Sequence, residues 1–167
     1  QARLLHAKLQ LLARDDAKAS QQVRLLGAEL ALAASDPRLA KELLVTGSAD
    51  LSTRPALFLW AQAMTSTGQA AQVAQQLQTW VASHTRDAQA WQLLSAAYAA
   101  QGKRLSALRA DAESYAAHLD YAAAQNRFKA AQDQVRLDGS TDHIEASIID
   151  TRSRQIAALL REQALER

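Results

Sequence analysis

One short stretch of the sequence places a histidine between acidic residues, the residue types that bind metal ions. Asp142, His143 and Glu145 fall within four consecutive positions. A metal site needs ligands that converge from more than one turn of backbone, and Asp142 is better placed to cap a helix that begins at residue 143. We therefore expect no metal at this stretch. The other histidines stand singly, and we expect ordinary surface or boundary roles for them: His6, His84 and His118.

Other catalytic motifs have no counterpart in the 167 residues. No histidine starts an H-E-x-x-H zinc motif, because the four histidines are followed by Ala, Thr, Leu and Ile. Cysteine is absent, which removes thiolate ligands, disulfides and a cysteine nucleophile. The turns TGSAD and LDGSTD lack the G-x-S-x-G elbow of serine hydrolases, and no loop is built to cradle a phosphate. We predict that this chain is not an enzyme and carries no cofactor.

The composition indicates a folded domain without a strong charge preference. Hydrophobic residues make up 49% of the chain, enough to bury a core. The 19 Lys and Arg nearly cancel the 17 Asp and Glu, and no window concentrates one sign of charge. A nucleic-acid or anionic-membrane footprint is therefore not expected. No apolar run approaches the ~20 residues needed to cross a bilayer, so we expect no membrane span.

Glycine and proline are few and fall between long stretches of helix-forming residues, which predicts an all-α fold. Helix starts are marked by Asp36-Pro37, Pro55, Asp87 and Asp120, and helix ends by Gly68 and Gly102. The predicted helices cover residues 2–13, 18–33, 37–45, 55–66, 69–83, 88–101, 103–117, 120–136 and 143–165.

A large, large, small, large pattern recurs on one helical face at a spacing of 34 residues. Its three copies are Val23, Leu26, Gly27 and Leu30; Leu57, Trp60, Ala61 and Met64; and Trp91, Leu94, Ser95 and Tyr98. This is the arrangement of the tetratricopeptide (TPR) repeat, which the chain resembles over residues 20–131. The small position receives the neighbouring helix, and the large positions fill the groove beside it. Asp111 departs from the pattern, since a TPR helix carries an aromatic residue there.

We therefore predict a TPR-like superhelical solenoid of antiparallel helix pairs with a long C-terminal helix. Residues 1–138 form the repeats, and residues 139–167 form a C-terminal helix of the same domain. That helix either caps the last repeat or docks on another domain or partner. Solenoids need caps at their ends, which favours the first alternative.

The last third of the chain carries a more specific resemblance. The stretches AESYAAHLDYAAAQNRFKAAQ and DHIEASIIDTRSRQIAALLREQ resemble the C-terminal region of BepA-type periplasmic zinc metalloproteases. The resemblance implies a periplasmic accessory domain whose zincin catalytic domain, with its H-E-x-x-H motif, lies elsewhere in the same polypeptide. It also implies a role in outer-membrane protein assembly and quality control. The implied partners are extended or unfolded outer-membrane protein segments and the β-barrel assembly machinery.

The repeat spacing also assigns a candidate partner-binding surface. In a TPR superhelix the first helix of each pair lines a concave face, on which we place an exposed Phe58 among amides, with arginines towards the ends. The predicted contact residues are Arg24, Phe58, Gln62, Gln89, Gln92, Arg109 and Glu113. A repeat protein that binds single-stranded RNA is the alternative, but a recurring pair of base-reading residues is lacking. A stand-alone TPR scaffold of another pathway also remains open.

Overall fold

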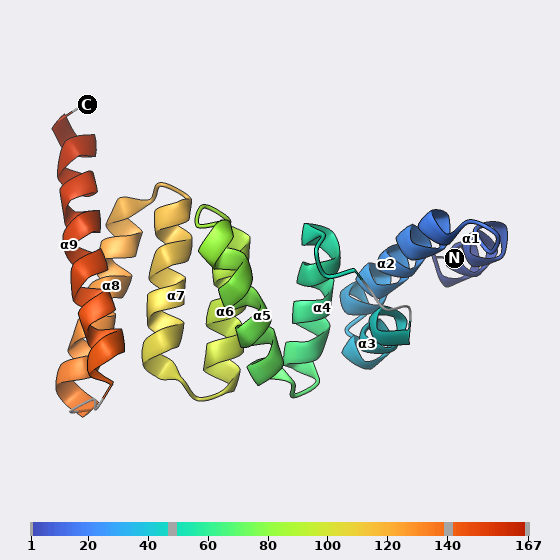
Figure 1. The fold of residues 1–167 in the computed structure, drawn as a ribbon, viewed down its shortest axis with the longest axis horizontal. Helices are drawn as coiled ribbons and strands as arrows, with labels where there is room; N and C mark the ends of the chain where they lie inside the picture. The colour runs from blue at the N-terminus through green and yellow to red at the C-terminus, as the bar shows by residue number, and fades with distance from the viewer. Residues whose placement is uncertain (1, 47–49, 139–141, 166–167) are drawn as a thin grey trace. The chain divides into compact units, whose positions relative to one another are not determined.

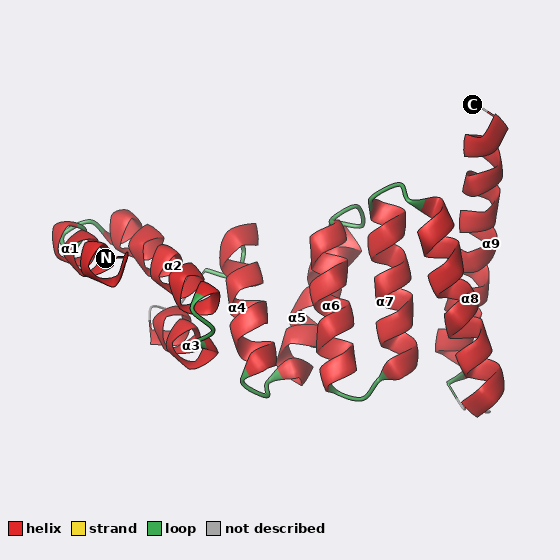
Figure 2. Cartoon of the chain, turned by 180° about the vertical axis from the view of Figure 1, so that it is seen from behind, coloured by secondary structure: helices red, strands yellow, loops and turns green. Residues whose placement is uncertain are grey.

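The computed structural model describes residues 2–46, 50–138 and 142–165, and these ranges contain nine α-helices and no strand (Figures 1 and 2). The helices are α1 (Ala2–Leu12), α2 (Ala17–Ala33), α3 (Pro37–Thr46), α4 (Arg54–Ser66), α5 (Ala70–Ser83), α6 (Ala88–Ala100), α7 (Arg104–Ala117), α8 (Tyr121–Asp138) and α9 (His143–Leu165). The predicted all-α class is confirmed, and the predicted helix boundaries agree with these to within two residues.

The chain divides into two compact units, Gln1–Ala70 and Ala71–Arg167. In the first unit α1 packs on α2, α2 on α3, and α4 on both α2 and α3. In the second unit α6 packs on α7, α7 on α8, and α9 on α8 and, less extensively, on α7. Figure 1 shows these last four helices side by side. In both units most of the packed pairs are helices that are consecutive in the chain, as in a helical solenoid.

Four helices end with the same backbone closure, a hydrogen bond from an amide just past the helix to a carbonyl five residues earlier. The four bonds are Asp36 N to Ala31 O, Gln69 N to Met64 O, Lys103 N to Tyr98 O, and Asp120 N to Tyr115 O. Such a closure requires one residue in the left-handed region. Gly68 and Gly102 supply it as predicted, whereas Ser35 (φ 59°) and Leu119 (φ 63°) do so at the other two ends.

Aspartates cap several helix starts, as the sequence predicts. Asp36, Asp87 and Asp120 each accept a hydrogen bond from the backbone amide three residues further on. Each bond satisfies one of the amides that a helix leaves unpaired in its first turn. Thr53 makes no such side-chain bond, and the start of α4 relies on Pro55 in its first turn.

The small positions of the repeat lie at helix contacts. Ala61 on α4 is fully buried. The Ser95 hydroxyl on α6 donates to the Ala107 carbonyl on α7 at 2.9 Å. A Cβ atom added to Gly27 on α2 would collide with the His6 ring of α1. The pattern therefore marks the points where neighbouring helices approach most closely.

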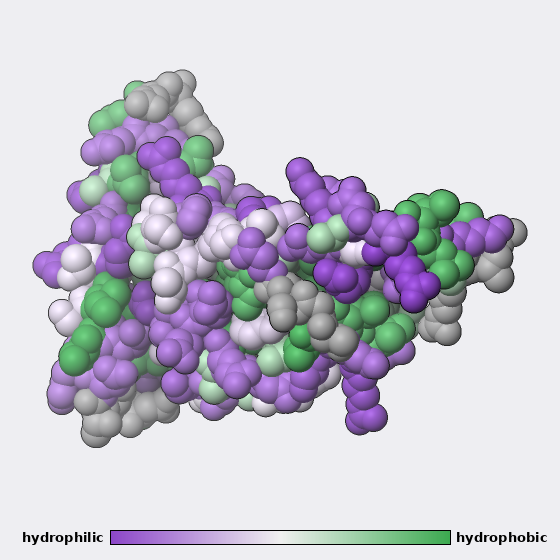
Figure 3. Space-filling view, turned by 45° about the vertical axis from the view of Figure 1, so that its right-hand side comes forward, coloured by the Kyte–Doolittle hydropathy of each residue, from purple (hydrophilic) through white to green (hydrophobic). Residues whose placement is uncertain are grey.

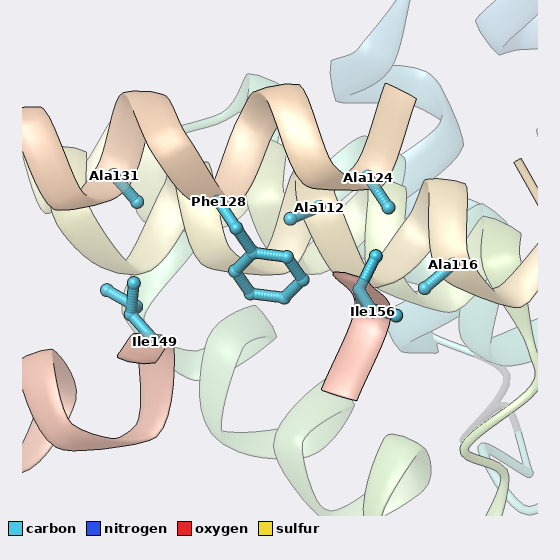
Figure 4. Close-up of a cluster of buried hydrophobic side chains, with 7 residues drawn as sticks. All are labelled: Ala112, Ala116, Ala124, Phe128, Ala131, Ile149 and Ile156. Carbon is cyan, nitrogen blue, oxygen red and sulfur yellow. The ribbon is translucent and has the colours of Figure 1, made fainter. Parts of the chain in front are cut away.

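The core of the second unit is built around Phe128 on α8, which is fully buried. Ile149 and Ile156 of α9 pack against it, together with alanines of α7 and α8 (Figure 4). The alanines leave room for the ring and bring the backbones close together. Because two of these core residues come from α9, this helix is part of the second unit's core.

Candidate functional site

Two predicted contact residues on α7 form ion pairs with α9. Arg109 Nε lies 2.6 Å from Glu145 Oε1. One turn further along α7, both carboxylate oxygens of Glu113 accept bonds from Arg152, from Nε and Nη2, each at 2.6 Å. This two-bond geometry is the strongest form of an arginine–carboxylate pair. The two pairs join the same faces of α7 and α9 over two turns.

The prediction that Arg109 and Glu113 are exposed is wrong, because α9 lies over them. Glu113 is only 7% exposed. The Arg152 guanidinium also donates to Gln155 Oε1 at 2.7 Å, so three of its N–H groups have hydrogen-bond acceptors in the protein. The hydrogen bond to Glu113 raises the pKa of Arg152 above its ordinary value despite partial burial, and its attraction to that carboxylate adds to the effect. The Arg152 guanidinium therefore keeps its positive charge at neutral pH.

Phe58 is the second correction. The sequence predicts an exposed aromatic at the centre of a binding face, but Phe58 is 5% exposed. The Arg54 guanidinium, one turn earlier on α4, lies 4.3 Å from its ring centroid. In the repeat pattern, Phe58 directly follows Leu57, which occupies one of the large positions. The structure shows that both Leu57 and Phe58 are buried on α4. The Phe58 side chain therefore packs in the interior and is not exposed for contact with a partner.

The remaining predicted residues lie on the first helices of their pairs. Arg24 on α2 and Gln62 on α4 are partly exposed and belong to the first unit, where these two helices pack together. Gln89 and Gln92 are exposed on α6 of the second unit, next to α7. Their role as partner contacts stays a prediction.

The second unit also contains a pocket of ≈ 540 Å³ that the sequence did not predict. It lies where the α5–α6 loop, the α7–α8 turn and α9 come together. Arg86, Trp91, Leu119, Tyr121 and Leu159 line it, with the Glu113–Arg152 pair beside them. Its volume is within the range of ligand pockets in proteins. The periodic pattern gave no signal for it, because half of its wall comes from turns and from α9, outside the repeat.

Asp142 acts as the predicted helix cap, since its carboxylate accepts a bond from the Glu145 amide at 3.0 Å. The Glu145 side chain is held by Arg109. Among the described residues, no three His, Cys, Asp or Glu side chains gather closely enough to hold a metal ion. None of the described helices is both long enough and apolar enough to span a membrane.

Hydrophobic side chains are also exposed at the N-terminal end of the chain. Leu5, Leu11 and Leu12 of α1 are open to solvent, and the space-filling view shows hydrophobic surface over this helix (Figure 3). The rest of the visible surface is mostly hydrophilic, with small hydrophobic areas between.

Comparison with known proteins finds one family model that matches part of this chain. Residues 49–120 match the family model described as a bacterial transcriptional activator domain. The matched segment runs from before α4 to the turn after α7, so it includes Arg86, Trp91 and Leu119 but none of α9. No curated protein matches the chain. The match supports a helical-repeat interaction module, and it gives no support to the metalloprotease resemblance.

Proposed function

We propose that the chain is a protein-interaction module of a larger protein, with its repeat helices acting as a scaffold that presents side chains to a protein partner. The observation that carries the proposal is that α6 buries one set of side chains in the second unit and exposes another set to solvent. Leu94, Ala97 and Tyr98 are buried, while Gln89 and Gln92 are exposed. The amide side chains can donate and accept hydrogen bonds with the backbone of an extended segment.

Two kinds of larger protein are candidates to contain this module. The match over residues 49–120 favours a bacterial transcriptional regulator, in which the module would receive another domain or a regulatory protein. The resemblance of residues 88–165 favours the periplasmic metalloprotease, in which the module would bind outer-membrane protein segments or the assembly machinery. Cell fractionation separates them, since only the second places the protein in the periplasm.

Nucleic acid is the weaker partner class for the module itself. The net charge is +2, and four of the arginines on α7 and α9 are engaged with protein groups: Arg109, Arg152, Arg154 and Arg161. Nucleic-acid binding needs several free cations on one face. We expect negligible retention on heparin at physiological salt.

The proposal is tested by co-purification from the native cell after nuclease treatment. Tagged wild type is compared with a variant that carries Gln89→Lys and Gln92→Lys. The matched control carries the same two changes at Gln75 and Gln76, which are exposed on α5. We expect proteins that are enriched with wild type to persist with the control and to be lost with the α6 variant. Equal recovery from all three proteins, or from none, would contradict the proposal.

A further inference from the structure

The pocket in the second unit combines aromatic and apolar walls with one free positive charge. The Trp91 ring is fixed by a hydrogen bond from its Nε1 to the Thr85 carbonyl at 2.9 Å. Tyr121 packs against the core of the second unit, so its position is set by that core. Leu119 and Leu159 are exposed at the pocket. A wall of this kind suits a large apolar side chain.

Leu119, at the edge of this pocket, is unusual in both its exposure and its backbone conformation. It is 61% exposed, and its φ of 63° is in the left-handed region that L-residues avoid. Glycines take the equivalent position after α4 and α6, and the small polar Ser35 takes it after α2. A leucine there is strained and places an apolar side chain in water, so neither backbone geometry nor burial explains the residue. A partner that covers Leu119 would account for an exposed leucine at this position.

The charged side chains of the pocket differ in whether they have an ion-pair partner. Glu113 and Arg152 neutralise each other through two hydrogen bonds. The Arg86 side chain is exposed and, among the described residues, has no ion-pair or hydrogen-bond partner. The pocket therefore presents one net positive charge beside an apolar wall. Its complement is a ligand with an apolar group and a carboxylate.

We propose that this pocket binds a protein segment that carries a large apolar side chain, such as phenylalanine, close to a carboxylate. The apolar side chain lies against Trp91, Leu119 and Leu159, and the carboxylate pairs with Arg86. The inference rests on the proposed function and names its partner chemistry. A nucleic acid does not fit, because one free cation stands beside the Glu113 carboxylate and a phosphate backbone requires several.

The proposal also gives α9 a role in recognition. Leu159 and Arg152 come from α9, whereas Arg86, Trp91 and Leu119 lie in the segment that matches the transcriptional activator family. The pocket is complete only with α9 in place.

The test is a fluorescence polarisation assay on the full chain with labelled peptide pools. The first pool carries one phenylalanine followed within a few residues by glutamate. In the second pool lysine replaces the glutamate, and in the third pool serine replaces the phenylalanine. A fourth pool has phenylalanine near a free C-terminal carboxylate and no glutamate. We expect binding of the first or fourth pool only, and the preferred pool identifies the source of the carboxylate.

Two variants assign the binding to the pocket. Arg86→Glu should weaken the preferred peptide about tenfold or more, because it turns attraction into repulsion. The matched control Arg104→Glu changes the same charge at an exposed position of α7 outside the pocket and should bind like wild type. Leu119→Gly relieves the backbone strain, so it should weaken binding severalfold while leaving the unfolding midpoint unchanged or higher.

The outcomes separate this inference from the function on which it rests. Binding of the preferred pool that survives both Arg86→Glu and Leu119→Gly overturns the pocket assignment and leaves an interaction module that uses another surface. Binding of no pool also overturns the assignment, and the co-purification experiment then decides separately whether the module has a protein partner. A lower midpoint for Leu119→Gly would show that Leu119 serves the fold, which removes it from the pocket's contact residues.

Discussion

At the scale of single residues, the Glu113–Arg152 pair matters because Glu113 is buried and Arg152 is only partly buried. Glu113 is nearly buried, while Arg152 on α9 reaches solvent. Removing the arginine leaves a carboxylate with little water around it, which is the costly way to break such a pair. The pair therefore contributes to holding α9 on α7 even though Arg152 is partly exposed.

We expect Arg152→Ala to lower the free energy of unfolding by about 1–3 kcal/mol in urea denaturation. The matched control is Arg154→Ala on the same helix, whose Nε donates to the Asp150 carbonyl of its own helix. That change should cost no more than about 0.5 kcal/mol. If both variants unfold at the same urea concentration, the pair does not stabilise the contact between α7 and α9.

Individual residues also show which features could be predicted from the sequence and which could not. The small positions Gly27, Ala61 and Ser95 were found because their period of 34 residues reflects repeated helix contacts. The burial of Phe58 was missed because a helical period marks which positions share a face, and it does not measure how widely that face is covered. Ser35 adopts the left-handed backbone one position later than the repeat spacing implies, since α2 runs one residue further.

At the scale of helices, most boundaries could be read from the sequence because local chemistry sets them. Aspartate caps and left-handed glycines act within a few residues of the helix end. The position of α9 could not be read in this way. Its ion pairs with α7 join residues 36 and 39 positions apart, and the sequence only favours capping of the last repeat over docking elsewhere.

The packing of α9 gives a prediction for that helix. Ile149 and Ile156 are buried against Phe128, so replacing either with alanine should cost about 2–5 kcal/mol of stability. Ile144 and Ile148 on the same helix are exposed and provide matched controls, for which we expect losses below about 1 kcal/mol. Thermal or urea unfolding of the four variants measures the difference. Equal losses from all four would mean that α9 does not present this face to the core.

At the scale of the whole molecule, the chain is two helical units in one repeat pattern, and the family match spans helices of both. The second unit holds the exposed amides of α6 and the pocket completed by α9. The sequence predicted the amides from the repeat but not the pocket, because the pocket depends on turns and on a helix outside the repeat. We expect the function of such a molecule to reside in exposed side chains carried by packed helices.

The central claim, that this scaffold binds protein through the second unit, is tested most directly by photo-crosslinking in the native cell. A photoreactive amino acid is placed at Gln92 on α6 in one variant and at Gln76 on α5 in the other, both exposed positions. The account predicts a discrete protein crosslink from position 92, weakened by Arg86→Glu, and none from position 76. Crosslinks of equal strength from both positions, or crosslinks to nucleic acid alone, would contradict it.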